Sequence, residues 1–452
     1  INPEMFSCNL APGESFDAPE AFLTYSAEGL GGMSSNLHDF MRNHLIRGGW
    51  APKKRPLLVN SWEAAYFDFD SEKLLGIAAS AAELGIEMLV LDDGWFGVRN
   101  DDTTSLGDWF VNTDKIGDMG ELVRKINALG VKFGLWFEPE MISEKSELYK
   151  KHPEWVLHEP GRRRSIGRQQ MLLDMSRPEV VQYLFDTISG VLRSANIEYV
   201  KWDMNRNMTE VYSDVLSPDC QGEVAHRYIL GVYKLHEMLL EAFPGLLIEG
   251  CSGGGGRFDA GMLAYVPQIW CSDDTDAMER IRIQLGTSYF YPVSAMGAHV
   301  SVCPNHLTGR FTPFATRGNI ALSGTFGYEL DLTKLSEEDQ ALVRRQVAEY
   351  HKYHDVIANG DLYRLSDSFK VNPFDAWMYV SKDRKEALIT TVSRFCRPND
   401  GVRFVRPRGL NPDAVYEVDG VKISGVTLMS VGIQVKLEPH DGASRLYYLK
   451  AE

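Results

Sequence analysis

Short apolar runs that end in polar or charged residues recur between about residues 55 and 330 of this chain. The runs are PLLVNSW, MLVLDDGW, KFGLWFEPE, QMLLDMS, YVKWDMN, LLIEGCSGG, QIWCSDD and PVSAMGAHVS, and amphipathic segments separate them. Runs of this length are typical of buried strands, and strands that alternate with helices indicate parallel βα units. Eight such units predict an α/β fold, a (β/α)8 TIM barrel. An open doubly wound sheet is disfavoured, because no glycine-rich turn follows the first run.

Helix boundaries are marked by capping residues. An Asp or Ser that precedes an apolar periodic segment, with an acidic residue three positions later, is typical of a helix start. A glycine that follows such a segment is typical of its end. These signals predict starts at Asp118 and Ser176, a further start at Ser336, and ends at Gly130 and Gly360.

The pattern changes after residue 360 to short alternating segments separated by Gly, Pro, Asn and Asp. Such segments predict a small antiparallel β-sandwich domain. We therefore expect a (β/α)8 catalytic barrel over residues 51–360 and an antiparallel β domain over residues 361–452. The chain begins with Ile, and its first residues read as mid-strand or loop, so we expect a fragment or a processed product.

Composition narrows the function. The chain has 47 Lys and Arg against 62 Asp and Glu, which gives no support to nucleic-acid binding. Its six cysteines form no CxxC pair, so we expect neither a zinc site nor a disulfide framework, and a reducing, cytoplasmic location. No run has the length of a membrane span, and the first residues do not resemble a signal peptide. We therefore expect no membrane partner.

The carboxyl ends of the predicted strands carry the chemistry. Lys201, Asp203 and Asn205 alternate, so an extended strand would place all three side chains on one side, at the mouth of the barrel. Aromatic rings cover apolar sugar faces and carboxylates accept hydrogen bonds from hydroxyls, and two carboxylates can cleave a glycosidic bond. The acids and aromatics at strand ends are Trp62, Asp92, Asp93, Trp136, Glu138, Glu140, Asp174, Asp203, Glu249, Trp270, Asp273 and Asp274.

Other interpretations of these residues remain open. A single strand-end aspartate is often a helix cap or a loop acid, and Asp174 before MSRPE fits that role. The glycine run from Gly250 could be only a flexible turn, and no Lys-Ser/Thr follows it to cradle a phosphate. Acids at barrel strand ends also hold Mg²⁺, with His299 or His306 as a further ligand. We expect no metal and no cofactor, because the tryptophans would add nothing to a Mg²⁺ site.

Five motifs resemble those of the retaining α-galactosidases of glycoside hydrolase family 36. They are LVLDDGWFG, GLWFEPEM, YVKWDMNR, IEGCSGGGGRFD and WCSDDTDAMERIRIQ. The resemblance implies that Asp203, on the fifth predicted strand, is the nucleophile and that Asp273, on the seventh, is the acid/base. In a retaining pair the two carboxyl groups lie roughly 5–5.5 Å apart.

The resemblance also implies roles in binding a terminal α-linked galactose of raffinose-type or melibiose-type oligosaccharides. Asp92 and Asp93 would bind the C4 and C6 hydroxyls, and Lys201 would reach C3 and C4. The C2 position would be surrounded by Asn205 and by the loop after the sixth strand. The remaining implied contacts are Cys251, Gly253 and Gly254 at C2, Trp62, Trp136 and Trp270 around the pocket, and Arg168 as a polar contact.

Residues 1–50 resemble the last part of that family's amino-terminal β domain and its connecting helix. In related tetramers this domain lends loops to a neighbour, so we expect a homo-oligomer and an effect of that domain on activity and assembly. Four other functions stay possible. They are an α-N-acetylgalactosaminidase, a galactosyl transglycosylase, an inactive sugar-binding barrel and a Mg²⁺-dependent lyase.

Overall fold

The computed structural model describes residues 4–370, 373–399 and 401–452, and its main sheet is a closed parallel barrel. The order of the strands around the barrel is β1-β10-β9-β8-β7-β6-β3-β2. The predicted fold class is confirmed. The strands are β1 (Leu58–Asn60), β2 (Met88–Leu91), β3 (Lys132–Phe137), β6 (Tyr199–Trp202), β7 (Leu247–Gly250), β8 (Gln268–Trp270), β9 (Met296–Ser301) and β10 (Thr325–Glu329).

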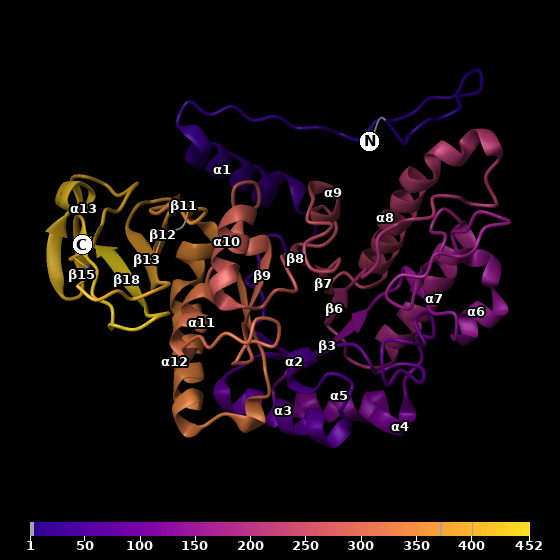
Figure 1. Ribbon diagram of the computed structural model, residues 1–452, viewed down its shortest axis with the longest axis horizontal. Coiled ribbons are helices and arrows are strands. Elements are labelled where there is room, and N and C mark those ends of the chain that lie inside the picture. The colour runs from indigo at the N-terminus through magenta and orange to yellow at the C-terminus, as the bar shows by residue number, and fades with distance from the viewer. Residues whose placement is uncertain (1–3, 371–372, 400) are drawn as a thin grey trace. The chain divides into compact units, whose positions relative to one another are not determined.

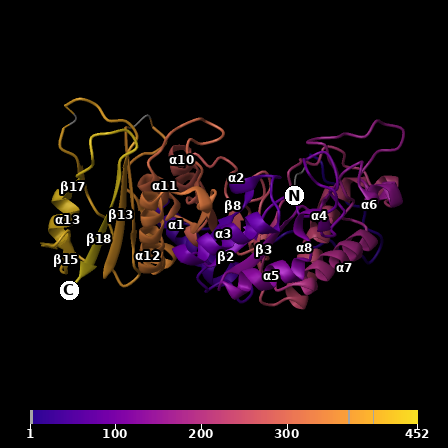
Figure 2. The ribbon, with the colours of Figure 1, turned by 90° about the horizontal axis from the view of Figure 1, so that it is seen from below.

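The chain divides into two compact units, and the first contains residues 65–79 and 89–266 with the segment up to Leu23. Its strands β3, β6 and β7 are parallel, with Trp136 opposite Lys201 and Lys201 opposite Glu249. Almost every residue of these strands is buried, as expected for a parallel sheet covered on both faces. Helices α7 (Pro178–Ser194) and α8 (Val224–Ala242) run side by side in both views (Figure 1, Figure 2).

The run at residues 170–176 is not a barrel strand, so this prediction is wrong. Its residues form β5 (Met171–Leu172), which pairs antiparallel with β4 (Met141–Ile142) in a separate two-stranded sheet. Both strands of this sheet are fully buried. An apolar run therefore marked burial correctly but could not distinguish a barrel strand from a strand of a separate small sheet.

The eighth barrel strand is β10, which the apolar pattern missed. Its sequence TFGYE has a glycine at its centre, and Gly327 lies opposite His299 of β9 and Leu58 of β1. A Cβ at Gly327 would lie 2.7 Å from His299 Cδ2 and 2.9 Å from the Leu58 carbonyl oxygen. The glycine is required by this close approach, and it removes an apolar side chain from the pattern. Because the run at residues 170–176 is not a barrel strand, Asp203 follows the fourth barrel strand rather than the fifth, the loop from Cys251 follows the fifth rather than the sixth, and Asp273 follows the sixth rather than the seventh.

The second unit contains residues 24–64, 80–88 and 267–452. Its carboxyl-terminal part is an antiparallel sheet in the order β11-β12-β13-β18-β15-β16, beside a two-stranded sheet β14-β17. Helices α11 (Phe314–Ala321) and α12 (Glu337–Asn359) contact this sheet at β13 and β18 (Figure 2). The strands are β11 (Asp361–Arg364), β12 (Phe374–Val380), β13 (Glu386–Ser393), β14 (Phe404–Val405), β15 (Val415–Val418), β16 (Val421–Ser424), β17 (Ile433–Gln434) and β18 (Ser444–Ala451).

Two of the three predicted helix starts are confirmed. Asp118 accepts a hydrogen bond from the Glu121 amide (2.7 Å) at the start of α5 (Met119–Ala128), and Ser336 caps α12 in the same way. The start at Ser176 is wrong, because α7 begins at Pro178. The remaining α-helices are α1 (Gly29–Phe40), α2 (Trp62–Ala65), α3 (Ser71–Leu84), α4 (Thr113–Ile116), α6 (Glu147–Lys151), α9 (Ala260–Leu263), α10 (Ala277–Thr287) and α13 (Gly425–Val431). Within the residues that the structure describes, no helix is both long enough and apolar enough to cross a membrane.

Candidate active site

Asp203 lies at the carboxyl end of β6, where its backbone amide continues the sheet by donating to the Phe137 carbonyl (2.8 Å). Its side chain is buried and accepts three N–H hydrogen bonds. Trp136 Nε1 (3.2 Å) and Asn205 Nδ2 (2.6 Å) donate to Oδ2, and the Met204 amide donates to Oδ1 (2.8 Å). Donors on both oxygens fix the direction of a carboxylate, so this group is aimed rather than mobile.

Two ion pairs lie beside this carboxylate in the same unit. Lys201 Nζ donates to Asp92 Oδ2 (2.9 Å), and Arg99 binds Asp93 through two nitrogens (2.6 and 2.7 Å). Lys201 and Asp92 therefore form a buried ion pair in this group of residues. The pKa of Asp93 is raised above its usual value, chiefly by burial. The charges of Asp92 and Asp203 raise this pKa further, whereas the charge and hydrogen bonds of Arg99 lower it.

Glu138, at the end of β3, is a fully buried carboxyl group next to this cluster. It accepts hydrogen bonds from the Asn205 amide (2.5 Å) and from Gln170 Nε2 (2.9 Å). Burial and the nearby charge of Asp203 raise the pKa of Glu138 to about 8. Asn205 therefore bridges two carboxyl groups, through its amide nitrogen to Glu138 and through its side chain to Asp203.

The raised pKa of Glu138 predicts a pH dependence. The folded state holds a proton on this carboxyl up to about pH 8, whereas the unfolded state loses it near the ordinary value of 4.5. This contribution to the free energy of unfolding is therefore present below about pH 4.5 and is lost as the pH rises to about 8. We expect Glu138→Gln, which mimics the protonated form, to flatten the fall in stability across this window in denaturant titrations. An unchanged slope would show that Glu138 does not titrate there.

The glycine-rich loop after β7 is attached to the end of β6. The Cys251 amide donates to the Trp202 carbonyl (2.7 Å), and Ser252 Oγ donates to the Met204 carbonyl (3.1 Å). Cys251 is buried, and the loop turns at Gly253 (φ +51°) and Gly254 (φ +81°), conformations that favour glycine. The loop is therefore held beside Asp203, as the predicted grouping of these residues requires.

Arg168 lies at the edge of this group. It is exposed, has a positive φ of 48°, and its Nη1 is 3.5 Å from the Asn205 carbonyl oxygen. Asp174, by contrast, serves the loop that precedes α7. It accepts hydrogen bonds from the Ser176 amide (3.0 Å) and the Ser213 hydroxyl (2.5 Å), which agrees with its interpretation as a loop acid.

The second unit carries Trp62, Trp270 and Asp273, each just after or at the carboxyl end of a strand. Trp62 begins α2, where its amide donates to Asn60 Oδ1 (2.7 Å). Trp270 is buried at the end of β8, and the guanidinium carbon of Arg280 lies 4.4 Å from its ring centroid. Asp273 is exposed, whereas the half-buried Asp274 accepts a backbone hydrogen bond from Asp276 (3.0 Å).

The residues proposed for a metal site are engaged with protein partners. His299 Nδ1 is 3.1 Å from Glu329 Oε2, and the ring of His299 lies 4.5 Å from that of Trp270. His306 Nδ1 is 3.2 Å from Glu63 Oε1. In the described part of the chain, no group of three or more His, Cys, Asp and Glu side chains is arranged so that it could hold a metal ion.

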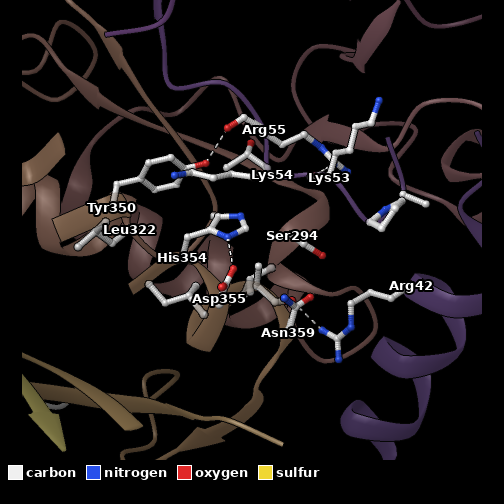
Figure 3. Close-up of a pocket in the computed structure, with 17 residues that line it drawn as sticks. Arg42, Lys53, Lys54, Arg55, Ser294, Leu322, Tyr350, His354, Asp355 and Asn359 are labelled. Atoms are coloured by element: carbon white, nitrogen blue, oxygen red, sulfur yellow. Dashed lines mark hydrogen bonds and ion pairs between the residues drawn. The ribbon is translucent and has the colours of Figure 1, made fainter. Parts of the chain in front are cut away.

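A hollow of about 250 Å³ in the second unit lies at the other end of the strands (Figure 3). It is lined by residues 53–55 before β1, by residues 293–294 before β9, and by Leu322, Gly324 and Thr325 at the start of β10. Figure 3 shows Tyr350 and His354 of α12 at its wall, with the Tyr350 hydroxyl bonded to the Arg55 carbonyl (2.9 Å). None of the predicted site residues lines it. In barrels, residues at the amino-terminal strand ends serve stability rather than chemistry.

Arg99, Gln170 and Arg257 belong to these networks but were missed from the sequence. Arg99 lies in a loop, so no strand pattern marks it, and Gln170 begins the run QMLLDMS, where the apolar pattern gives a polar residue no role. Arg257 had a weak signal, because it directly follows the glycine run.

The barrel and this cluster define the class: a (β/α)8-barrel protein with an acidic, hydrogen-bonded site at the carboxyl ends of its strands. The chain belongs to the melibiase family, whose model matches residues 15–360, and the model of the glycosyl hydrolase family 36 C-terminal domain matches residues 374–449. The resemblance expected from the motifs is thereby confirmed.

Among its relatives, α-galactosidase AgaA of Geobacillus stearothermophilus is 51% identical over 453 residues, which cover 100% of this chain and 62% of AgaA. Crystal structures of two AgaA variants, one in complex with raffinose and one with stachyose, each align with a TM-score of 0.98 at 50% identity. These alignments cover 100% of this chain and 63% of each solved chain. The chain thus spans less than two thirds of the length of these relatives.

Proposed function

We propose that this chain carries the active site of a retaining α-galactosidase that removes terminal α-linked galactose by double displacement. Asp203 attacks the anomeric carbon, and Asp273 gives its proton to the leaving oxygen. The covalent β-galactosyl intermediate is then hydrolysed by a water molecule that Asp273 deprotonates. The observation that supports this proposal best is the Asp203 carboxylate, held at the end of β6 by N–H donors on both oxygens.

The relatives support the choice of the two aspartates. The AgaA variant in complex with raffinose has one aspartate replaced, and the variant in complex with stachyose has another aspartate replaced. Those two aspartates are separated along AgaA by the same number of residues as Asp203 and Asp273 are here. The exposure of Asp273 also suits an acid that exchanges its proton with water, whereas Asp274 is bonded to the backbone.

The same relatives suggest the substrate. AgaA variants bind raffinose and stachyose, and we propose raffinose-type or melibiose-type α-galactosides for this chain. Asp92, Asp93 and Lys201 form buried ion pairs near Asp203, and charged carboxylate and ammonium groups are strong hydrogen-bonding partners for sugar hydroxyls. We assign Asp92 and Asp93 to the C4 and C6 hydroxyls, Lys201 to C3 and C4, and Asn205 with the loop from Cys251 to C2.

Trp62, Trp136 and Trp270 complete the proposed pocket walls, with Arg168 as an outer polar contact. The division of the chain at residues 50 and 360, the cytoplasmic location and a homo-oligomer stay predictions. An α-N-acetylgalactosaminidase and a transglycosylase are the alternatives within the family. The substituent accepted at C2 of the sugar distinguishes an α-galactosidase from an α-N-acetylgalactosaminidase.

We expect the chain to release nitrophenol from nitrophenyl α-galactoside and to discriminate against the α-N-acetylgalactosaminide by roughly a hundredfold or more in kcat/KM. Cys251 is buried and the chain turns at Gly253 and Gly254, and under the proposed assignment this glycine backbone lies close to C2 and leaves no volume for an acetamide group. The β-galactoside and the α-glucoside serve as controls. Rates for the two α-substrates within threefold of each other would contradict the C2 assignment, and no release from the α-galactoside would contradict the function.

A further inference from the structure

Glu140, two residues after Glu138, is completely buried and accepts four hydrogen bonds. Arg257 binds it through both terminal nitrogens, Nη1 to Oε2 (2.9 Å) and Nη2 to Oε1 (2.7 Å). Trp202 Nε1 donates to Oε1 (2.9 Å), and the Tyr228 hydroxyl donates to Oε2 (2.6 Å). Glu140 therefore joins the end of β3 to β6, to α8 and to the last residue of the glycine-rich loop.

The members of this cluster belong to the segments that carry the proposed catalytic and C2 residues. Trp202 directly precedes Asp203, and its carbonyl accepts the Cys251 amide (2.7 Å) at the start of the loop. Arg257 closes the loop at its other end, after Gly256. The glycine-rich loop is thus attached at Cys251 through the backbone of Trp202, and at Arg257 through a carboxylate that also holds the Trp202 ring.

The charges of the cluster balance within it. Burial alone would raise the pKa of Glu140, but the charge and hydrogen bonds of Arg257 lower it overall. Burial raises the pKa of the Tyr228 hydroxyl well above its usual value, so it stays a neutral donor. His236, whose ring lies 4.2 Å from that of Trp202, has a pKa lowered by burial to about 4 and is neutral at pH 7. The pair is therefore one anion and one cation, and the charge of Asp203 also favours the charged form of Arg257 by raising its pKa.

We infer that the Glu140–Arg257 pair is a positioning device that fixes the far end of the glycine-rich loop and so sets discrimination at C2 of the sugar. This inference rests on the proposed function, because it needs the loop to lie beside C2. The four glycines that follow Ser252 have no side chains that could define the path of the chain, since glycine restricts the backbone least. The residues on either side of these glycines must then fix their path, and on the far side a bidentate guanidinium–carboxylate pair supplies a direction as well as an attachment.

The experiment compares Arg257→Gln, Arg257→Lys and Glu140→Gln with the wild-type chain, measuring kcat and KM for nitrophenyl α-galactoside and its α-N-acetylgalactosaminide. Loosening the loop should lower kcat/KM for the galactoside by roughly tenfold to a hundredfold, because small misplacements near a reacting sugar are costly. It should also shrink the ratio of galactoside to N-acetylgalactosaminide kcat/KM by roughly tenfold, since the space denied to the acetamide opens. Arg257→Lys keeps the charge but not the bidentate geometry, so it should recover part of the ratio.

Arg227→Gln is the matched control, because Arg227 also pairs with a carboxylate, Glu223, but at the start of α8 and away from the loop. It should leave the ratio unchanged. The double variant Glu140→Gln/Arg257→Gln leaves neither Glu140 nor Arg257 as an unpaired buried charge. If the two residues act as a unit, its kcat/KM for the galactoside should be no lower than that of the less active single variant. Circular dichroism and thermal unfolding show whether each variant is folded. If folded variants keep the wild-type ratio of galactoside to N-acetylgalactosaminide kcat/KM, the inference is overturned and the proposed function is left intact. A wild-type chain without α-galactosidase activity would overturn both.

Discussion

Replacing Asp203 by glycine is expected to lower kcat for nitrophenyl α-galactoside by at least about four orders of magnitude, because no covalent intermediate can form without the nucleophile. The three donors around this carboxylate would remain. The space left by the carboxylate can admit azide, which attacks the anomeric carbon once from the side opposite the leaving group. The expected product is therefore β-galactosyl azide, identified by NMR.

Asp203→Asn is the control for this variant. It keeps the size of the side chain and can still meet some of the same donors, so it should fold as the wild type does. It should be as inactive as Asp203→Gly but should not be rescued by azide, because no space is created. Substantial activity in either variant without azide would remove Asp203 from the role of nucleophile.

Replacing Asp273 by glycine should affect substrates unequally, because a good leaving group needs little protonation. We expect kcat/KM for raffinose to fall by roughly two to four orders of magnitude, the usual contribution of general acid catalysis. For nitrophenyl α-galactoside kcat/KM should fall much less, and kcat should fall because the intermediate is hydrolysed slowly. Azide should accelerate this second step and give α-galactosyl azide.

Asp274→Gly is the matched control, since the two aspartates are adjacent and differ in their contacts. Asp274 accepts a hydrogen bond from the Asp276 amide, so its loss should lower stability more than it changes the preference for leaving groups. If Asp274→Gly gives α-galactosyl azide and Asp273→Gly does not, the acid has been assigned to the wrong residue.

The fold was predictable from the sequence wherever a strand is marked by apolar side chains. Seven of the eight predicted runs contain barrel strands, and five of those seven end in one of the five motifs of the family resemblance. The pattern failed at β10, where Gly327 is needed for close contact with β9 and β1. It failed again at residues 170–176, since burial in a separate two-stranded sheet and burial in a barrel select the same apolar residues.

The contacts within the candidate site were less predictable than the proximity of some of its residues. Alternation along an extended strand predicted that Lys201, Asp203 and Asn205 lie together, whereas β6 ends at Trp202, and Asn205 reaches Asp203 from beyond the strand. The ion pair of Asp93 with Arg99 and that of Glu140 with Arg257 join residues far apart along the chain, so local spacing could not reveal them. The protonated state of Glu138 depends on burial and on the charge of Asp203, which only the folded arrangement supplies.

The central claim is that this chain hydrolyses α-galactosides with retention through Asp203 and Asp273. Proton NMR of nitrophenyl α-galactoside hydrolysis, recorded before mutarotation equilibrates the sugar, tests it most directly. Two displacements, each with inversion, predict α-galactose as the first product, with its anomeric doublet appearing before that of the β anomer. β-Galactose as the first product would show a single displacement by water and would contradict the account.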